Sequence, residues 1–270
     1  MMESDKKEPI LHYYEIGAGV TAFSSTRQGG YGKGRYGEFN INRFCGDDEE
    51  TVRRNREALC QLLGVDDERL LMPHQVHRTE IAVVTENLLG LPAEEHQARL
   101  EGVDALMTDV PGVCIGVSTA DCIPVLLYDK SRKAVCAIHA GWRGTVQRIV
   151  EKAVSRMTAV YGTRPADVTA QIGPGISLDS FEVGHEVYDT FANAGFNMVS
   201  ISRKFPSSPF PQKWHIDLPE CNHRQLLSAG LSADNIAVSC ICTYKQHDTY
   251  FSARRLGINS GRIFTGIMIR

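Results

Sequence analysis

The middle of the chain holds a series of short apolar runs that are separated by glycine, proline, aspartate or serine. Runs of this length, rich in Val, Ile and Leu, are typical of β-strands. Within each run the apolar residues follow one another without alternating polar positions, which is the pattern of strands covered on both faces. We therefore predict buried strands at residues 81–85, 105–108, 113–117, 123–128 and 134–138.

Helices are predicted on both sides of this strand-rich region. The clearest is within residues 46–64, where acidic residues occupy the first turn, apolar residues share one stripe, and Gly64 ends the pattern. Three more helices are expected at residues 142–161, 181–194 and 218–229. In the first of these, the apolar positions recur every three or four residues up to Val160.

Further short strands are expected on both sides of these elements, so that strands outnumber helices along the whole chain. They are predicted within residues 10–24, as two strands, and at 168–172, 236–240, 249–252 and 263–269. Interleaved strands and helices of this kind predict an α/β fold with mixed β-sheets and helices packed outside. We expect one domain over residues 1–270, with residues 1–9 as a flexible N-terminus.

Composition and charge exclude several classes of protein. Of the 270 residues, 43% are hydrophobic and 23% charged, which is ordinary globular composition, and the net charge of -3 provides no general attraction to nucleic acid or to anionic lipid. The longest apolar stretch, residues 113–128, is interrupted by polar residues and is too short to span a membrane. The charged N-terminus does not resemble a secretory signal. We expect a cytoplasmic protein without a nucleic-acid or membrane partner.

Three residues of metal-ligand type stand at predicted strand ends or in the turns beside them. They are His77, Cys122 and His139. Ligand sites of α/β proteins lie at strand ends next to helix N-termini, so these three side chains converge if their strands are neighbours. Two imidazoles and one thiolate make a three-ligand zinc site whose fourth position is open to water or substrate.

The same residues also allow other chemistry. Cys122 as nucleophile, His139 as base and Asp121 or another carboxylate as orienting group would make a cysteine-type hydrolase or amidase. Two histidines and a cysteine are also the ligands of blue copper, which would indicate a laccase-type polyphenol oxidase. The chain has nine histidines and no His-x-His pair, which argues against a four-copper centre. A binding protein without catalytic activity is a further alternative.

Several side chains are candidates for binding an anionic substrate. Arg27 stands among hydroxyl groups and glycine amides in a glycine-rich loop that lets backbone approach a ligand. Arg143 opens the helix that follows His139, and Arg254 and Arg255 follow a predicted strand. Gln75 precedes His77 in the segment HQVH and is a further candidate for contact with substrate.

Several segments of the chain resemble the bacterial YfiH-like family. These proteins have been called multicopper polyphenol oxidoreductases, or laccases, and are now regarded as purine nucleoside phosphorylases. The resemblance runs from about residue 20 to the C-terminus, and its most specific elements are TADC and HAGWRG. The matching segments include STRQGG at 25–30, FNINRFCGDD at 39–48, HQVH at 74–77, TADC at 119–122, HAGWRG at 139–144, CTY at 242–244 and FSARR at 251–255.

The resemblance implies a four-layer α/β fold and a metal held by His77, Cys122 and His139, with zinc as the ion and copper as its alternative. It implies that purine nucleosides and phosphate are the substrates. Adenosine, inosine, guanosine and S-methyl-5'-thioadenosine would be cleaved to the base and (methylthio)ribose 1-phosphate, with adenosine deamination as a side activity. Two positions depart from the family pattern: Arg78 stands where glycine is usual, and Ala253 where an aromatic residue is common.

Overall fold

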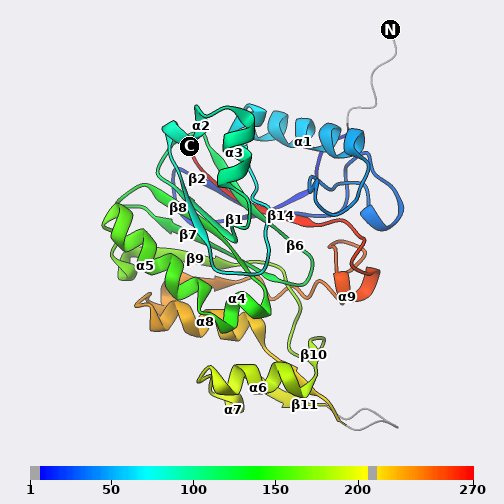
Figure 1. Cartoon of the computed structure of the whole chain (residues 1–270), viewed down its shortest axis with the longest axis vertical. Helices are drawn as coiled ribbons and strands as arrows, with labels where there is room; N and C mark the ends of the chain where they lie inside the picture. The colour runs from blue at the N-terminus through cyan, green and yellow to red at the C-terminus, as the bar shows by residue number, and fades with distance from the viewer. Residues whose placement is uncertain (1–6, 206–211) are drawn as a thin grey trace.

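Two β-sheets packed face to face form the centre of the protein in a computed structural model that describes residues 7–205 and 212–270 (Figure 1). The first sheet has five strands in the order β1-β2-β14-β6-β3. Their bounds are β1 Leu11–Tyr14, β2 Val20–Ser25, β14 Ile263–Ile269, β6 Cys114–Thr119 and β3 Leu70–Leu71.

The second sheet has six strands in the order β13-β9-β7-β8-β5-β4. It is mixed, because β7 pairs antiparallel with both β8 and β9, whereas β4 runs parallel to β5 and β13 parallel to β9. The bounds are β13 Ile236–Val238, β9 Val168–Ile172, β7 Ile123–Asp129, β8 Ala134–Ala140, β5 Ala105–Thr108 and β4 Ile81–Val84.

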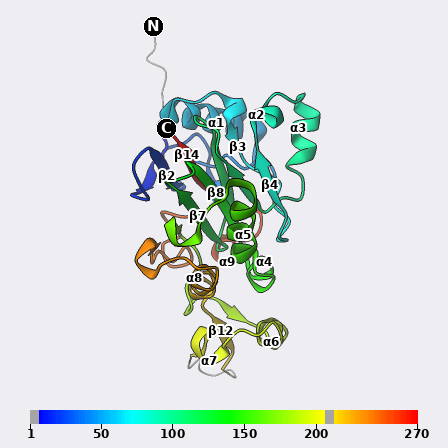
Figure 2. The same ribbon diagram turned by 90° about the vertical axis from the view of Figure 1, so that its left-hand side faces the viewer.

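Helices cover the outer face of each sheet, which makes four layers. On the outer face of the five-stranded sheet, Leu59 and Leu63 of α1 pack with Phe23 and Phe264. The opposite face of the molecule is covered by α5 and α8 (Figures 1 and 2). The helices are α1 Glu49–Leu63, α2 Glu86–Leu89, α3 Ala93–Arg99, α4 Trp142–Val146, α5 Ile149–Tyr161, α6 His185–Asn193, α7 Met198–Ile201, α8 Leu218–Ser228 and α9 Ala253–Leu256. The expected α/β class with four layers is confirmed.

The continuous apolar runs are explained by this layering. In β7, Val125 and Leu127 point to the helices, whereas Leu126 and Tyr128 point to the other sheet. Both faces of the strand are therefore buried, and every residue of β7 and β8 is inaccessible to solvent or nearly so. Burial of this much apolar surface is the main favourable contribution to folding.

The helix predicted at residues 142–161 is divided in two. Arg148 adopts a left-handed conformation with φ of 63°, which ends α4 and places α5 on a new axis. The guanidinium of Arg148 lies 3.7 Å from the ring centroid of Phe196 and donates to the carbonyl of Ala194. The apolar periodicity runs through the break without interruption, and for this reason the sequence pattern did not reveal it.

Two further predictions were wrong. Residues 182–183 belong to β10, not to a helix, and α6 begins only after Gly184. The strand predicted at 249–252 is a turn that leads into α9, with the amides of Thr249 and Tyr250 donating to the carbonyl of Gln246. Tyr250 and Phe251 are buried because their side chains pack in a small cluster with Ile263, and not because they belong to a sheet.

A small three-stranded sheet was not predicted at all. It has the order β10-β12-β11, with bounds Glu182–Val183, Trp214–Ile216 and Ser202–Lys204, and projects from the main body together with α6 and α7 (Figure 1). Tyr188 of α6 stacks on Trp214 at 4.2 Å between ring centroids. Strands of two or three residues are too short to show a period.

No helix among the described residues is both long and apolar enough to cross a membrane. Of the N-terminal residues expected to be flexible, 1–6 lie outside the described residues, and Pro9 is buried.

Candidate active site

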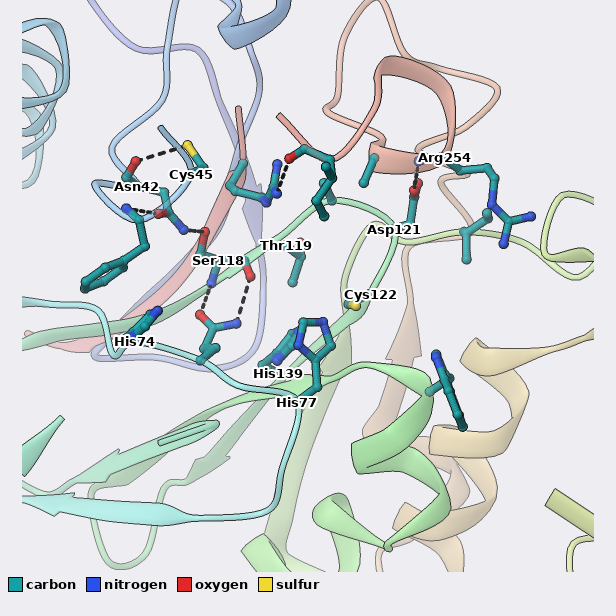
Figure 3. A pocket seen from close by; sticks show the side chains of 18 of the residues that line it. Asn42, Cys45, His74, His77, Ser118, Thr119, Asp121, Cys122, His139 and Arg254 are labelled. Carbon is teal, nitrogen blue, oxygen red and sulfur yellow. Dashed lines mark hydrogen bonds between the residues drawn. The ribbon is translucent and has the colours of Figure 1, made fainter. Parts of the chain in front are cut away.

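A pocket of about 630 Å³ opens where β6 and β8 end and β7 begins. Its lining comes from the loop before α1, the segment after β3, the turn between β6 and β7, the start of α4, and the stretch from α9 to β14 (Figure 3). Residues that are far apart in the sequence therefore meet at one place. The volume lies within the range of small-molecule sites.

His77, Cys122 and His139 lie together at the base of this pocket (Figure 3). One ligand atom from each residue can be chosen so that the three atoms lie within 4.8 Å of one another. His139 is in β8 and only 3% exposed, Cys122 is in the turn between β6 and β7, and His77 is in the loop after β3. Among the described residues this is the one group of at least three histidine, cysteine or acidic side chains with metal-binding geometry. The convergence expected from strand ends is present.

Asp104, which sequence reasoning missed, holds both histidines in place. Its carboxylate is fully buried and lies 2.7 Å from Nδ1 of His139. It also accepts hydrogen bonds from the backbone amides of Val76, His77 and Arg78. Since Nδ1 of His139 bonds to this carboxylate, Nε2 is the nitrogen that faces the cluster. The left-handed turn at His77, with φ of 62°, is stabilised by the same three amide bonds.

The charges of the cluster favour a thiolate. Burial acts to raise the pKa of Cys122, but the imidazoles of His139 and His77 outweigh it and lower the pKa to about 6. Burial acts to lower the pKa of His139, but the Cys122 thiolate and Asp104 raise it to about 9. For Asp104 burial likewise acts to raise the pKa, and hydrogen bonds from His139 and from the amides of Arg78 and Val76 bring it below its ordinary value. A thiolate is the form that binds metals and acts as a nucleophile.

Gly141 leaves the space between the three ligand side chains open. A Cβ atom built on it would lie 2.9 Å from Cδ2 of His77 and 3.0 Å from Sγ of Cys122. Real Cβ atoms essentially never approach neighbours within 3.0 Å, so any other residue here would displace one of the two ligands. Gly141, the first glycine of the HAGWRG segment, is therefore required for the three side chains to come together.

Three of the candidate substrate-binding residues lie at or near the pocket, and one of them, Arg254, is in its lining. Gln75 also lines the pocket, but its amide is already engaged: Nε2 donates to the carbonyl of Ser118, and Oε1 accepts from the amide of Ser118. Arg143 is exposed on α4, and its guanidinium lies 4.2 Å from the ring of Trp142, which does line the pocket. Gln75 thus joins the loop of His77 to the end of β6.

Arg27 is not among the residues that line the pocket. Its guanidinium donates to the carbonyls of His247 and Gly34 and lies 5.1 Å from the ring of Phe251. These contacts connect the glycine-rich loop to the segment before α9. In the structure, Arg27 therefore joins two loops behind the pocket wall.

Asp121 joins the turn of Cys122 to the outer wall of the pocket. Its Oδ1 accepts from the hydroxyl of Thr243 and its Oδ2 from the backbone amide of Arg254, both at 2.7 Å. It stands at a φ of 85°, which aspartate and asparagine tolerate better than most residues. The carboxylate that orients His139 is Asp104 and not Asp121.

Comparison with known proteins agrees with the fold. The structure superimposes on that of the hypothetical protein YfiH of Bacillus licheniformis with a TM-score of 0.88 at 28% identity, over 100% of this chain and 98% of that one. YlmD of Geobacillus stearothermophilus matches with a TM-score of 0.84 at 30% identity and the same coverage. Four layers with the pocket at the strand ends therefore define a protein of the YfiH/YlmD class.

Sequence relatives cover the whole chain. The chain belongs to the family described as multi-copper polyphenol oxidoreductase laccase, whose family model matches residues 21–270. It is 45% identical over 271 residues to a protein of Bacteroides thetaiotaomicron named purine nucleoside phosphorylase, covering 100% of this chain and 99% of the relative. It is also 45% identical to a protein from an unknown prokaryote named adenosine deaminase RL5, covering 99% of each. The family resemblance inferred from the motifs is confirmed.

Proposed function

We propose that this protein is a metal-dependent purine nucleoside phosphorylase that also deaminates adenosine. Its substrates are adenosine, inosine, guanosine and S-methyl-5'-thioadenosine, and its products are the free base and (methylthio)ribose 1-phosphate. The observation that carries the proposal is the His77–Cys122–His139 cluster at the base of a pocket of nucleoside size. The names of the two relatives at 45% identity support purine nucleosides as the substrates.

The residues of the cluster fit a metal ion. Two imidazoles and a thiolate are ligands that zinc prefers, and three protein ligands are typical of catalytic rather than structural zinc. Asp104 supplies the carboxylate that usually orients a ligating histidine, and Gly141 leaves room between the ligands. Copper binds such ligands more tightly than zinc in the Irving–Williams order, so the ion that is bound depends on availability. We propose zinc, with copper as the alternative.

The two reactions differ in the nucleophile and in the atom that it attacks. In phosphorolysis a phosphate oxygen forms a bond to the anomeric carbon of ribose, the bond to the purine nitrogen breaks, and the base takes up a proton. In deamination water adds at C6 of adenosine and ammonia leaves, which gives inosine. A zinc ion bound at such a site polarises an attached oxygen and lowers the pKa of attached water to about 7.

The chain's own residues orient and charge the site. Asp104 accepts a hydrogen bond from Nδ1 of His139, which keeps Nε2 directed to the cluster. The low pKa of Cys122 keeps its sulfur ionised at neutral pH. The hydrogen bonds between Gln75 and Ser118 hold the loop of His77 against β6, so the two sides of the site do not separate.

The test is turnover of nucleosides with and without phosphate. Zinc-loaded protein is incubated with inosine and with adenosine, and ribose 1-phosphate, free base and ammonia are measured. We expect ribose 1-phosphate only in the presence of phosphate, and ammonia from adenosine in both conditions. Absence of ribose 1-phosphate in the phosphate arm would reject the phosphorylase function.

A cysteine-type hydrolase is the second candidate, because Asp104, His139 and Cys122 are connected in the order that such enzymes use. Chelation and alkylation separate the two functions. A hydrolase acting through Cys122 retains its activity in a chelator and loses it on alkylation, whereas the proposed enzyme loses activity on chelation and regains it with zinc.

A laccase-type oxidase needs several copper ions. The described residues contain one suitable cluster, which argues against a multi-copper centre despite the family's description. A metal count together with oxygen consumption on a phenol tests this alternative directly.

A further inference from the structure

Thr119, a residue that lines the pocket, has a buried hydroxyl group without a hydrogen-bond partner among the described residues. Its side chain is at the end of β6, is only 1% exposed, and lines the pocket (Figure 3). No hydrogen-bond partner for Oγ1 is present anywhere in residues 7–205 and 212–270. A buried hydroxyl without a partner costs about 1–3 kcal/mol. Because Thr119 lines the pocket, a ligand bound there is the group that can supply the missing partner once the side chain turns toward it.

Two arginines stand beside Thr119 in the same pocket. Thr119 pairs with Ile263 between β6 and β14, so Arg262 lies next to it across the strands. Arg254 is tied to the following turn through its backbone amide, which donates to Asp121. Both arginines line the pocket.

The donors of the two arginines are used differently. The guanidinium of Arg262 bonds to the carbonyls of Ile258, Ser260 and Gly261, which holds its charge in a constant position. The guanidinium of Arg254 is exposed and donates through Nη1 to the carbonyl of Glu182. Within the described part of the chain, Nε and Nη2 of Arg254 have no acceptor, and they are free to bind a ligand.

The negative groups of the pocket do not cancel this charge. Both carboxylate oxygens of Asp121 already accept hydrogen bonds, and Cys122 belongs to the proposed metal cluster. The Thr119 hydroxyl, the free nitrogens of Arg254 and the fixed positive charge of Arg262 together suit an oxyanion with several acceptor oxygens.

We propose that Thr119, Arg254 and Arg262 form the binding site for inorganic phosphate. This inference rests on the proposed phosphorylase function and names the residues that hold its second substrate. It replaces Arg27 and Arg143, neither of which lines the pocket. The phosphate lies near Cys122, which is three residues after Thr119 in the same turn, so that its oxygen faces a nucleoside bound over the cluster.

The experiment compares Michaelis constants for phosphate and for inosine in three variants. Thr119→Val removes the hydroxyl and keeps the shape, and we expect the KM for phosphate to rise about tenfold while that for inosine changes less than twofold. Thr119→Ser keeps the hydroxyl and restores the KM for phosphate. Thr163→Val is the matched control, because Thr163 is also buried without a hydrogen-bond partner but lies outside the pocket. It leaves both constants at the wild-type value.

Arg254→Gln provides a second variant that keeps the fold, since its side chain is exposed. We expect it to raise the KM for phosphate by at least tenfold. The inference is overturned if both Thr119→Val and Arg254→Gln leave the KM for phosphate unchanged, or if they raise only the KM for inosine. The second result would assign these residues to the nucleoside.

Direct titration with inorganic phosphate separates this inference from the proposed function. Calorimetry is carried out on wild-type protein and on Thr119→Val without nucleoside. If the wild type binds phosphate, the variant binds it about tenfold more weakly and no nucleoside is cleaved, the phosphate site stands and the phosphorylase function is rejected. If nucleosides are cleaved and both proteins bind phosphate equally, the phosphate site is rejected and the function stands.

Discussion

The base and the outer wall of the pocket are built in different ways. At the base, one buried carboxylate, Asp104, bonds to His139 and to three successive amides that include the amide of His77. In the wall, Asp121 makes two hydrogen bonds to Thr243 and Arg254, and Arg254 itself is exposed. A buried network is costly to disturb, because each group left without a partner keeps its full desolvation penalty. On the function proposed above, we infer that the buried base carries the chemistry and that the more accessible wall recognises the substrate.

Removal of Cys122 at the base should have the largest effect. Cys122→Ala deletes one of three proposed ligands, and we expect loss of bound zinc and a fall of at least about a thousandfold in both activities. Cys45→Ala is the matched control, since Cys45 lines the same pocket outside the cluster. Metal analysis and nucleoside turnover are measured on both variants. Stoichiometric zinc in Cys122→Ala would show that Cys122 is not a ligand.

Asp104→Asn tests whether the carboxylate positions both histidines. The amide has the same shape but one acceptor oxygen in place of two, and we expect zinc affinity to fall about 10- to 100-fold. Competition with a chelator measures the affinity, and Asp109→Asn on the exposed surface is the control. Unchanged zinc affinity together with reduced thermal stability would limit Asp104 to a structural role.

Zinc binding should depend on pH because His139 is protonated in the metal-free protein. Its pKa is raised to about 9, whereas that of Cys122 is lowered to about 6, so at pH 7.5 the thiol is already ionised and binding has to displace the proton of His139. We expect release of about one proton at pH 7.5, and an affinity that rises with pH and levels off above about 9. The charged His139 stabilises the metal-free fold below about pH 6.5, and this contribution is lost as the pH rises through 9. Calorimetry in buffers of different ionisation enthalpy measures the proton; no proton release at pH 7.5 would contradict the assignment.

Asp121→Asn in the wall should have the smallest effect. Asparagine tolerates the left-handed backbone, and its single acceptor oxygen keeps the bond from the amide of Arg254, so the bond from the Thr243 hydroxyl to the carboxylate is lost, at about 1 kcal/mol. We expect a rise of about three- to tenfold in the KM values with zinc content unchanged. Thr243→Val removes the hydroxyl that makes the same bond. The KM values of the double variant should therefore be no higher than those of either single variant. Loss of zinc from Asp121→Asn would mean that the wall also supports the base.

The sequence pattern predicted the elements that are long or deeply buried. The helix α1 has its acidic cap at Asp48, its apolar stripe and its end at Gly64, and all three are local signals. The strands β7 and β8 were visible because both of their faces are buried. The break at Arg148 and the strands β10 to β12 were not visible, since they depend on contacts with distant residues such as Phe196.

The candidate site could be predicted in part for the same reason. His77, Cys122 and His139 carry distinctive chemistry in turns beside strand ends, so their residue types and positions were sufficient to select them. Asp104 and Thr119 were not selected, because an aspartate before a strand and a threonine at the end of one are common. Their significance comes from a 2.7 Å contact to His139 and from a hydroxyl that has no partner.

By itself the sequence determined the α/β class, the buried strands and the three residues of the cluster, since these follow from periodicity and side-chain chemistry. Only the tertiary structure decided which carboxylate orients His139, which arginines line the pocket and which of them bond elsewhere. The reason is that hydrogen bonds between residues such as Asp104 and His139 depend on the pairing of β5 with β8. That pairing brings distant parts of the chain together and leaves no local pattern in either part.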